Sequence, residues 1–350
     1  MKTKYKLLTL APFSYSVPSV GSSSLMILCL FLPQVFLLFF TKNYLSVLQI
    51  FISVLAAISA DILYSLFVKK PIIPSITSIL QGFLIGFFIP TGYSPFLLFF
   101  VIIFSLELTY YLFDGFAQSW VNPIAITVIF LYLFGTEFFP NFTVNTYHLQ
   151  SPNIGQQLVN EGLIPKINLD ESITNFLNGN LFRYAGVALP EGYVSIFWDT
   201  GSLIPAFRFN LLTIFAIIVL LAFGGIKWII PSVFIFVYGL LVRIFGLFPY
   251  GGILNQGDIL LAIFSSGTMV VAFLLLQWPG TTPLTIVGKV IYGVLAGVFA
   301  FLIMGAGTSP IGAMFVILLS NLISPLIQLL EDLIYQQILK AKGKKYDFQN

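Results

Sequence analysis

Long apolar runs alternate with short polar segments along most of the chain, and one long polar stretch, residues 137–208, divides these runs into two groups of five. A helix needs about 20 largely apolar residues to cross a bilayer, and the strands of a membrane barrel are shorter and alternate. The pattern therefore predicts membrane-spanning helices. The expected spans are residues 25–39, 44–67, 76–89, 95–113 and 124–134, then 209–223, 228–248, 259–277, 287–304 and 311–330.

The composition supports this interpretation. Only 8% of the residues are charged and 58% are hydrophobic, whereas a soluble domain carries roughly 25% charged residues. A single cysteine, Cys29, excludes an internal disulfide, and with a single histidine, His148, a Cys/His metal site within the chain is not credible. A net charge of +3 is too small and scattered for nucleic-acid binding. We expect an all-α polytopic membrane protein surrounded by lipid.

Lysine and arginine positions set the expected orientation, because positive charge collects on the cytoplasmic side. Ten spans with both termini in the cytoplasm place most of the basic residues inside, as expected for a bacterial inner membrane. The expected organisation is a first repeat (1–136), an outer loop (137–208), a second repeat (209–337) and a cytoplasmic tail (338–350). The inner residues are Lys2, Lys4, Lys6, Lys69, Lys70, Lys227, Lys289, Lys340, Lys342, Lys344 and Lys345; the outer ones are Lys42, Lys166, Arg183, Arg208 and Arg243.

The two groups of spans resemble each other when they are shifted by about 184–189 residues. Because five is odd, the second copy is inverted in the membrane, and inverted repeats place a binding site near the midplane at short or broken helices. The matching pairs are residues 90–95 with 278–283, 121–125 with 308–312, and Gly82 with Gly267.

The third span of each group is the expected place for a ligand. Residues 75–90 form a short, Pro-flanked segment, and Ser265 to Thr268 interrupt the corresponding span. Gly82, Gly267 and Thr268 are therefore candidate cofactor-binding residues. The alternative is that these residues are small because helices pack closely there.

Two acidic residues fall inside expected spans. Asp61 lies in the second span and Glu107 in the fourth, both in the inner half of the bilayer. An intramembrane carboxylate suggests a functional site, so the pair could share a proton or cation on an ion pathway. The alternative is that each is neutral or bonded to a neighbouring helix. Arg243 lies toward the outer face, and Asp258 is expected to cap the eighth span.

The connection at residues 114–123 is polar but carries a single charge. Irregular backbone at membrane depth is tolerated only where protein or a cavity surrounds it. Gln118, Trp120 and Asn122 offer stacking and amide hydrogen bonds to a flat ring, so they are candidate cofactor-binding residues. An interfacial tryptophan in an ordinary turn is the alternative.

Three stretches resemble a known family. Residues 77–90 are similar to its small-residue helix ending in proline, residues 113–123 to its Phe-Gly-Gly…Asn-Pro loop, and residues 266–326 to its most specific segment. The chain thus resembles the D-type membrane component of Rnf electron-transport complexes, which shares a family with the B-type component of the sodium-pumping NADH:quinone reductase. The resemblance covers nearly the whole chain. It implies a five-plus-five inverted repeat, like that of urea and ammonium channels, and partner subunits.

The resemblance also implies a flavin. Family members carry FMN linked by a phosphodiester to a threonine in an outer-loop Asp-x-x-Ser/Thr-x-Ala-Thr motif. The nearest segment here is residues 169–177, with Thr174 as the attachment residue; residues 199–202 match less well. The motif is incomplete, and Gln277-Trp278-Pro279 and Tyr110 replace a family Thr-Asp-Pro and lysine. A family arginine after the ninth span is also missing.

The leading hypothesis is a membrane subunit of an Rnf-like complex that relays electrons through FMN or riboflavin, coupled to Na⁺ or H⁺ movement. The chain carries no NAD-binding or iron–sulfur motif, so other membrane and peripheral subunits are expected to supply its electrons. One alternative is a five-plus-five solute channel or transporter. The other is a structural subunit that has kept the fold and lost the flavin.

Overall fold

The computed structural model describes residues 18–69, 74–112, 119–144, 153–246 and 254–347, and every regular element in them is a helix. The first half contains α1 (Val20–Phe40), α2 (Tyr44–Val68), α3 (Ile76–Phe87), α4 (Pro95–Leu106), the π-helix η1 (Glu107–Tyr111) and α5 (Pro123–Phe134). The connecting segment contains η2 (Thr136–Phe138), α6 (Ile154–Asn160), α7 (Asp170–Asn180), η4 (Phe182–Ala185), α8 (Tyr193–Trp198) and η5 (Pro205–Phe207). The second half contains α9 (Asn210–Ala222), α10 (Ile229–Phe245), α11 (Ile259–Phe264), α12 (Thr268–Val270), the π-helix η6 (Val271–Leu275), α13 (Ile286–Met304) and α14 (Gly312–Asp347).

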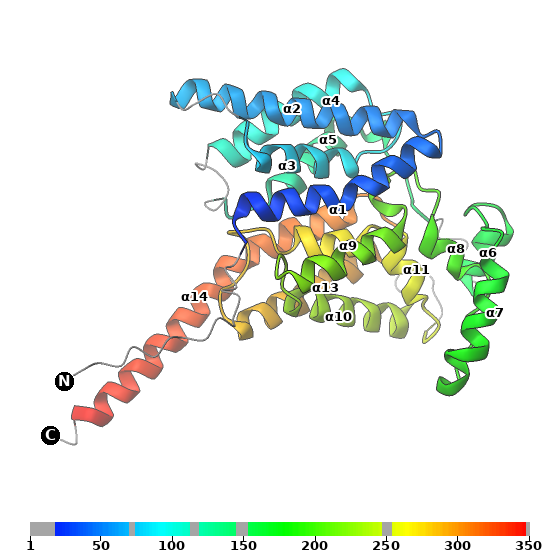
Figure 1. Ribbon diagram of the computed structural model, residues 1–350. Coiled ribbons are helices and arrows are strands. Elements are labelled where there is room, and N and C mark those ends of the chain that lie inside the picture. Colours follow the sequence, from blue (N-terminus) through cyan, green and yellow to red (C-terminus); the bar gives the residue numbers. More distant parts are fainter. Residues whose placement is uncertain (1–17, 70–73, 113–118, 145–152, 247–253, 348–350) are drawn as a thin grey trace, which may run out of the picture.

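The helices of both halves form one bundle (Figure 1). Helices α6, α7 and α8 lie at one end of this bundle, which we call the loop-side end. Helix α1 begins and helix α14 ends at the other end, which we call the terminal end, and the last turns of α14 project away from the bundle there. Helix α7 runs across the direction of the long helices (Figure 1).

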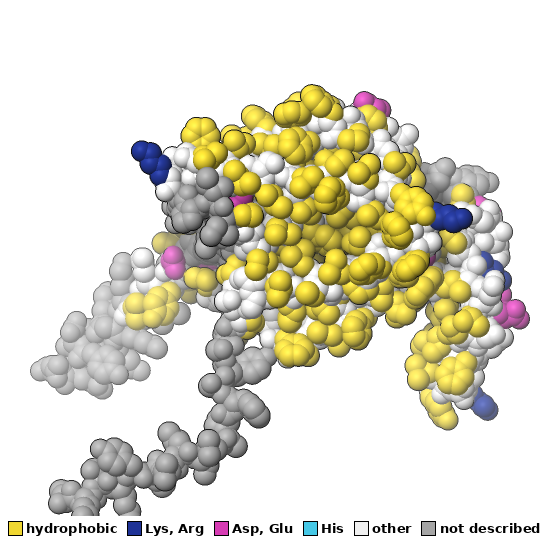
Figure 2. Space-filling model, turned by 45° about the horizontal axis from the view of Figure 1, so that its top comes forward, with side chains coloured by type: hydrophobic (Ala, Val, Ile, Leu, Met, Phe, Trp, Pro, Cys, Tyr) yellow, Lys and Arg dark blue, Asp and Glu magenta, His cyan; other side chains and the backbone are white. Residues whose placement is uncertain are grey.

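Among the described residues, four helices are long and apolar enough to cross a membrane: α1, α2, α13 and the part Gly312–Gln337 of α14. Five shorter apolar helices lie beside them, at Ile76–Phe87, Pro95–Thr109, Pro123–Phe134, Asn210–Ala222 and Ile229–Phe245. Figure 2 shows a broad hydrophobic surface over the middle of one face, with basic side chains at its two ends. The prediction of an all-α, multi-pass membrane protein is confirmed at this level.

Side-chain caps fix where several helices begin, because the first backbone N–H groups of a helix lack partners within it. Ser75 accepts from Ser78 N at the start of α3, and Thr285 accepts from Gly288 N at the start of α13. Asp258 accepts from Leu261 N at the start of α11. The predicted role of Asp258 as a helix cap is therefore confirmed.

Glycines allow α2 and α3 to pack closely. A Cβ atom added at Gly82 would lie 2.6 Å from the Ser53 carbonyl oxygen, and one added at Gly86 would lie 2.7 Å from the Ile50 Cα atom. Small residues at such contacts let helix backbones approach within a membrane. Gly82 thus faces α2, and the close-packing interpretation describes its position in the structure.

The segment expected at 259–277 is broken, as the sequence predicts. Helix α11 ends at Phe264, and Gly267 has a φ of 64° before α12 and η6 continue. Residues other than glycine rarely adopt this left-handed conformation. The corresponding segment in the first half, α3, is one unbroken helix. The third segments of the two halves therefore differ at the position of the matched pair Gly82 and Gly267.

Candidate functional site

Asp61 lies in a cluster of hydroxyl groups at the terminal end of the first half. Its Oδ2 atom accepts hydrogen bonds from Ser75 N at 2.7 Å and from the Ser78 hydroxyl at 2.8 Å. The Ser78 hydroxyl also lies 3.2 Å from the Tyr111 hydroxyl. Asp61 is only 9% exposed. The start of α3 and the end of η1 therefore build a polar site around a carboxylate of α2.

Glu107 is the second carboxylate of this site. It opens the π-helix η1, and its buried Oε1 atom has no hydrogen-bond partner among the described residues. Asp61 is close enough to act on Glu107 electrostatically. Single-turn π-helices frequently mark functional sites. The structure therefore brings together the two acidic residues that the sequence singled out.

These groups offer chemistry suited to a small hard cation or a proton. Carboxylate and hydroxyl oxygens are the ligands that such cations prefer. A buried carboxylate oxygen that lacks a partner is costly unless it is protonated or faces a cation. The site thus combines one well-bonded carboxylate with one that has spare binding capacity.

Asn122 joins the two halves of the chain. Its Oδ1 accepts from Ile124 N and Ala125 N at the start of α5, and its Nδ2 donates to the Leu275 carbonyl at 2.9 Å. Trp120 is 43% exposed, and Gln118 lies outside the described residues. The structure therefore gives Asn122 a structural contact, while Trp120 lies on the surface.

Gly267 and Thr268 are buried beside the loop that precedes α9. A Cβ atom added at Gly267 would lie 2.6 Å from the Phe207 ring, and that ring makes an edge contact with Phe88 at the end of α3. The Thr268 hydroxyl lies 2.6 Å from the Ser266 hydroxyl. Gly267 therefore meets the end of α3 through Phe207, whereas Gly82 faces α2.

Thr174 lies inside helix α7. It is 2% exposed, and its hydroxyl lies 3.4 Å from Asp170 Oδ1. Asp170 also accepts from Gly192 N, Ser195 N and the Ser195 hydroxyl, which ties α7 to α8. A phosphodiester link needs an exposed hydroxyl, so a covalent FMN on Thr174 does not fit this arrangement.

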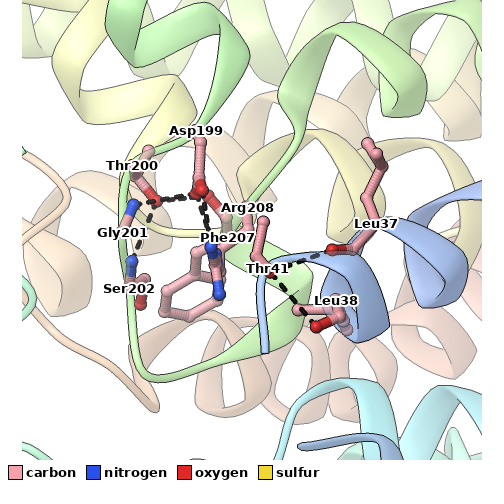
Figure 3. Close-up of polar contacts among 9 residues, drawn as sticks. All are labelled: Leu37, Leu38, Thr41, Asp199, Thr200, Gly201, Ser202, Phe207 and Arg208. Atoms are coloured by element: carbon pink, nitrogen blue, oxygen red, sulfur yellow. Dashed lines mark hydrogen bonds and ion pairs between the residues drawn. The ribbon is translucent and has the colours of Figure 1, made fainter. Parts of the chain in front are cut away.

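The other candidate flavin segment, residues 199–202, is held by an ion pair (Figure 3). Arg208 donates to Asp199 through Nε at 2.8 Å and through Nη2 at 2.5 Å. The Thr200 hydroxyl donates to the Phe207 carbonyl at 2.7 Å. Thr200 is thus engaged within its own loop. The Asp199–Arg208 pair was not predicted from the sequence, although its members are only nine positions apart.

The structure also contains a large apolar cavity at the loop-side end, which the sequence analysis did not predict. Its volume is about 1230 Å³, and it is lined by α7, α8 and the adjacent ends of α9, α10 and α11. Phe197, Trp198 and Tyr193 contribute aromatic side chains. At its polar edge, the Tyr193 hydroxyl donates to Asp258 at 2.5 Å and Arg243 donates to the Gly257 carbonyl at 3.3 Å.

Comparison with known proteins identifies the family. The family model described as "NQR2, RnfD, RnfE family" matches residues 7–333. The chain belongs to this family. The NQR2, RnfD, RnfE assignment confirms the resemblance inferred from the three sequence stretches.

Curated relatives are named as the D-type component of an "Ion-translocating oxidoreductase complex". The protein of Escherichia fergusonii is 23% identical over 349 residues, which cover 91% of this chain and 94% of that protein. The protein of Shewanella pealeana is 22% identical over 299 residues, 80% of this chain and 83% of that protein. The protein of Klebsiella pneumoniae is 33% identical over 146 residues, but the match spans only 37% of its length.

Proposed function

We propose that this chain is the membrane subunit of an Rnf-like complex, in which electron transfer drives Na⁺ or H⁺ across the membrane. The family match over residues 7–333 and the relatives named as components of an ion-translocating oxidoreductase complex support this function. Other membrane and peripheral subunits would surround the chain and deliver its electrons. We place it in the bacterial inner membrane as a five-plus-five inverted repeat of ten helices, with the terminal end and both termini in the cytoplasm.

The ion-translocation part of the proposal is based on the site at Asp61 and Glu107. Both carboxylates belong to the terminal end, and Glu107 Oε1 has no hydrogen-bond partner in the part of the chain that the structure describes. A proton or Na⁺ at this oxygen would complete a site already formed by Asp61, Ser78 and Tyr111. Intramembrane carboxylates in such positions commonly serve ion pathways.

We further propose that any FMN or riboflavin is held without a covalent bond. Burial of the Thr174 hydroxyl argues against attachment at that residue. The apolar cavity at the loop-side end offers Phe197 and Trp198 as surfaces against which an isoalloxazine ring could pack. A bound flavin would supply one-electron chemistry, while the residues of this chain would hold and orient it.

The solute-channel alternative receives less support from the structure. Gly82 packs against α2, and Gly267 packs against Phe207. Neither glycine lines the apolar cavity at the loop-side end. Solute flux through vesicles in the absence of a reductant would favour the channel.

Ion uptake by the intact complex in vesicles tests the proposal. We expect Asp61→Asn and Glu107→Gln to reduce redox-driven Na⁺ or H⁺ uptake by about tenfold or more, the scale of a lost charged ligand. Electron transfer measured under uncoupled conditions should persist. Asp332→Asn, an exposed acid on the same end of the bundle, is the matched control. Unchanged uptake in both site variants would contradict the ion pathway.

Flavin is tested separately by two readouts. In-gel ultraviolet fluorescence of the denatured chain detects covalent flavin, and we expect none. Absorbance of the gently extracted native protein should show bound flavin that is released on denaturation. Fluorescence on the denatured chain that persists in Thr174→Ala would place a covalent link elsewhere and refute the non-covalent proposal.

A further inference from the structure

A second cavity lies at the terminal end, between the two halves of the chain. Its volume is about 360 Å³. Helices α1 and α3 line it from the first half, and the α9–α10 turn and the η6–α13 connection line it from the second. This cavity is separate from the Asp61 site and from the cavity at the loop-side end, since it shares no lining residue with either.

Two lysines line this cavity. Lys227 precedes α10 and Lys289 lies in the first turn of α13. Their ammonium groups are close enough to repel each other. Glu331 lies near Lys289 and accepts a hydrogen bond from the Thr285 hydroxyl. Within the described residues neither lysine forms an ion pair, so the cavity edge keeps positive charge that an anion would neutralise.

The rest of the cavity is suited to an amphiphile. Ile27 of α1, Leu80 and Leu84 of α3 and Leu274 of η6 form apolar walls. Ser23 and Thr282 also line it, and a serine or threonine hydroxyl can donate to an oxygen-rich group. The cavity therefore combines cations and hydroxyl donors with walls that favour hydrocarbon.

The exposed residues around the cavity place it at the boundary between lipid and water. Trp228, beside Lys227, is 66% exposed. Leu284 and Ile286, which precede Lys289, are 83% and 67% exposed. Tryptophan collects at the level of lipid headgroups, and basic pockets between membrane helices bind anionic headgroups there.

We propose that this cavity binds one anionic phospholipid from the adjacent leaflet. Its phosphate lies between Lys227 and Lys289, and the start of one acyl chain lies against Ile27 and Leu84. The lipid then contacts both halves of the chain at the terminal end and ties them together.

Lipid retention measured on the full-length protein tests this proposal. The protein is purified in mild detergent with phosphatidylglycerol or phosphatidylcholine added, and native mass spectrometry counts the retained lipids. Each lysine near a headgroup contributes about fivefold in affinity, so Lys227→Gln/Lys289→Gln should weaken phosphatidylglycerol binding about thirtyfold. Lys227→Arg/Lys289→Arg should retain it. Lys69→Gln, a lysine at the same end but outside the cavity, is the matched control.

Two further measurements distinguish the phosphate of a bound lipid from inorganic phosphate. Ile27→Trp places a larger side chain on the apolar wall and narrows the cavity, so it should weaken phosphatidylglycerol retention. It leaves the charges of Lys227 and Lys289 in place. Inorganic phosphate should compete with phosphatidylglycerol only weakly. Equal retention of phosphatidylcholine, full retention in the double glutamine variant, or tight inorganic phosphate binding at these lysines without lipid would each overturn the lipid assignment.

Discussion

Asn122 Nδ2 donates to the Leu275 carbonyl at 2.9 Å, across 153 residues of sequence. Leu275 ends the π-helix η6, and its carbonyl also accepts a hydrogen bond from Trp278 N at 3.3 Å. The same asparagine caps α5 through Oδ1. One fully buried amide therefore begins a helix of the first half and completes the end of a helix in the second.

Asn122→Ala should consequently destabilise the folded protein. The variant loses a helix cap, which costs about 1 kcal/mol. It also loses one of the two hydrogen bonds to the Leu275 carbonyl, which costs about 0.5–1.5 kcal/mol because Trp278 N still donates to that oxygen. We expect a clear fall in the thermal unfolding midpoint in detergent. Asn175→Ala, at an exposed position on α7, should leave the midpoint in place. Equal midpoints for Asn122→Ala and the wild type would show that this amide does not link the halves.

Asp61 and Glu107 should differ in their effects on stability although both serve the same proposed site. Asp61→Ala removes the acceptor of two hydrogen bonds and should lower the free energy of unfolding by about 2–4 kcal/mol. Glu107→Ala removes a carboxylate whose buried Oε1 has no hydrogen-bond partner within residues 18–69, 74–112, 119–144, 153–246 and 254–347, so the unfolding midpoint should fall much less. Denaturant titrations of both variants in the same detergent provide the comparison. A larger loss in Glu107→Ala would show that Glu107 has a structural role.

Gly267→Ala should destabilise the break between α11 and α12. The left-handed backbone costs a residue with a Cβ atom about 1–2 kcal/mol, and that atom would lie 2.6 Å from the Phe207 ring. Gly179→Ala on α7 is the control, because an added Cβ meets nothing within 4 Å there and alanine favours a helix. Thermal unfolding should therefore shift down for Gly267→Ala and slightly up for Gly179→Ala.

Periodicity and length were enough to predict the apolar helices, because an apolar run in a membrane protein has one dominant solution. The short helices α6, α7 and α8 of the connecting segment were not predicted. The break at Gly267 and the cap at Asp258 followed from local residue types. The partners of Asn122 and Gly82 could not be predicted, since they depend on which helices become neighbours. The flavin hypothesis at Thr174 depended on a motif, but burial of its hydroxyl follows from the packing of α7 against α8.

Long-range polar contacts are the other feature that could not be predicted from the sequence. Asp61 and Glu107 could be placed in the same half of the bilayer from span order alone. The hydroxyls of Ser78 and Tyr111, which complete their site, occur in segments that read as ordinary apolar helices. The sequence does not show which of many serines and tyrosines meet a carboxylate.

The Asp199–Arg208 ion pair should stabilise the entry into α9. Both side chains are about nine-tenths buried, with 11% and 9% exposure. Removing one member of a buried pair typically costs about 3–5 kcal/mol, because the remaining charge is left without a partner. We expect Arg208→Met to lower the unfolding midpoint more than Asp199→Asn/Arg208→Met does. If the double variant loses as much stability as Asp199→Asn and Arg208→Met lose together, the two residues act independently.

Tyr193 should make the stability of the loop-side end sensitive to alkaline pH. Burial raises the pKa of Tyr193 well above its usual range, and the nearby charge of Asp258 and their hydrogen bond raise it further. A raised folded-state pKa stabilises the folded protein below the unfolded-state value of about 10. This contribution falls as the pH rises above that value toward the folded-state pKa.

Unfolding midpoints measured from pH 8 to 11.5 should therefore decline above about pH 10 in the wild type. Tyr193→Phe should show a shallower decline, whereas Tyr184→Phe, at a position that is 90% exposed, should follow the wild type. Parallel curves for all three proteins would show that Asp258 does not hold the Tyr193 proton.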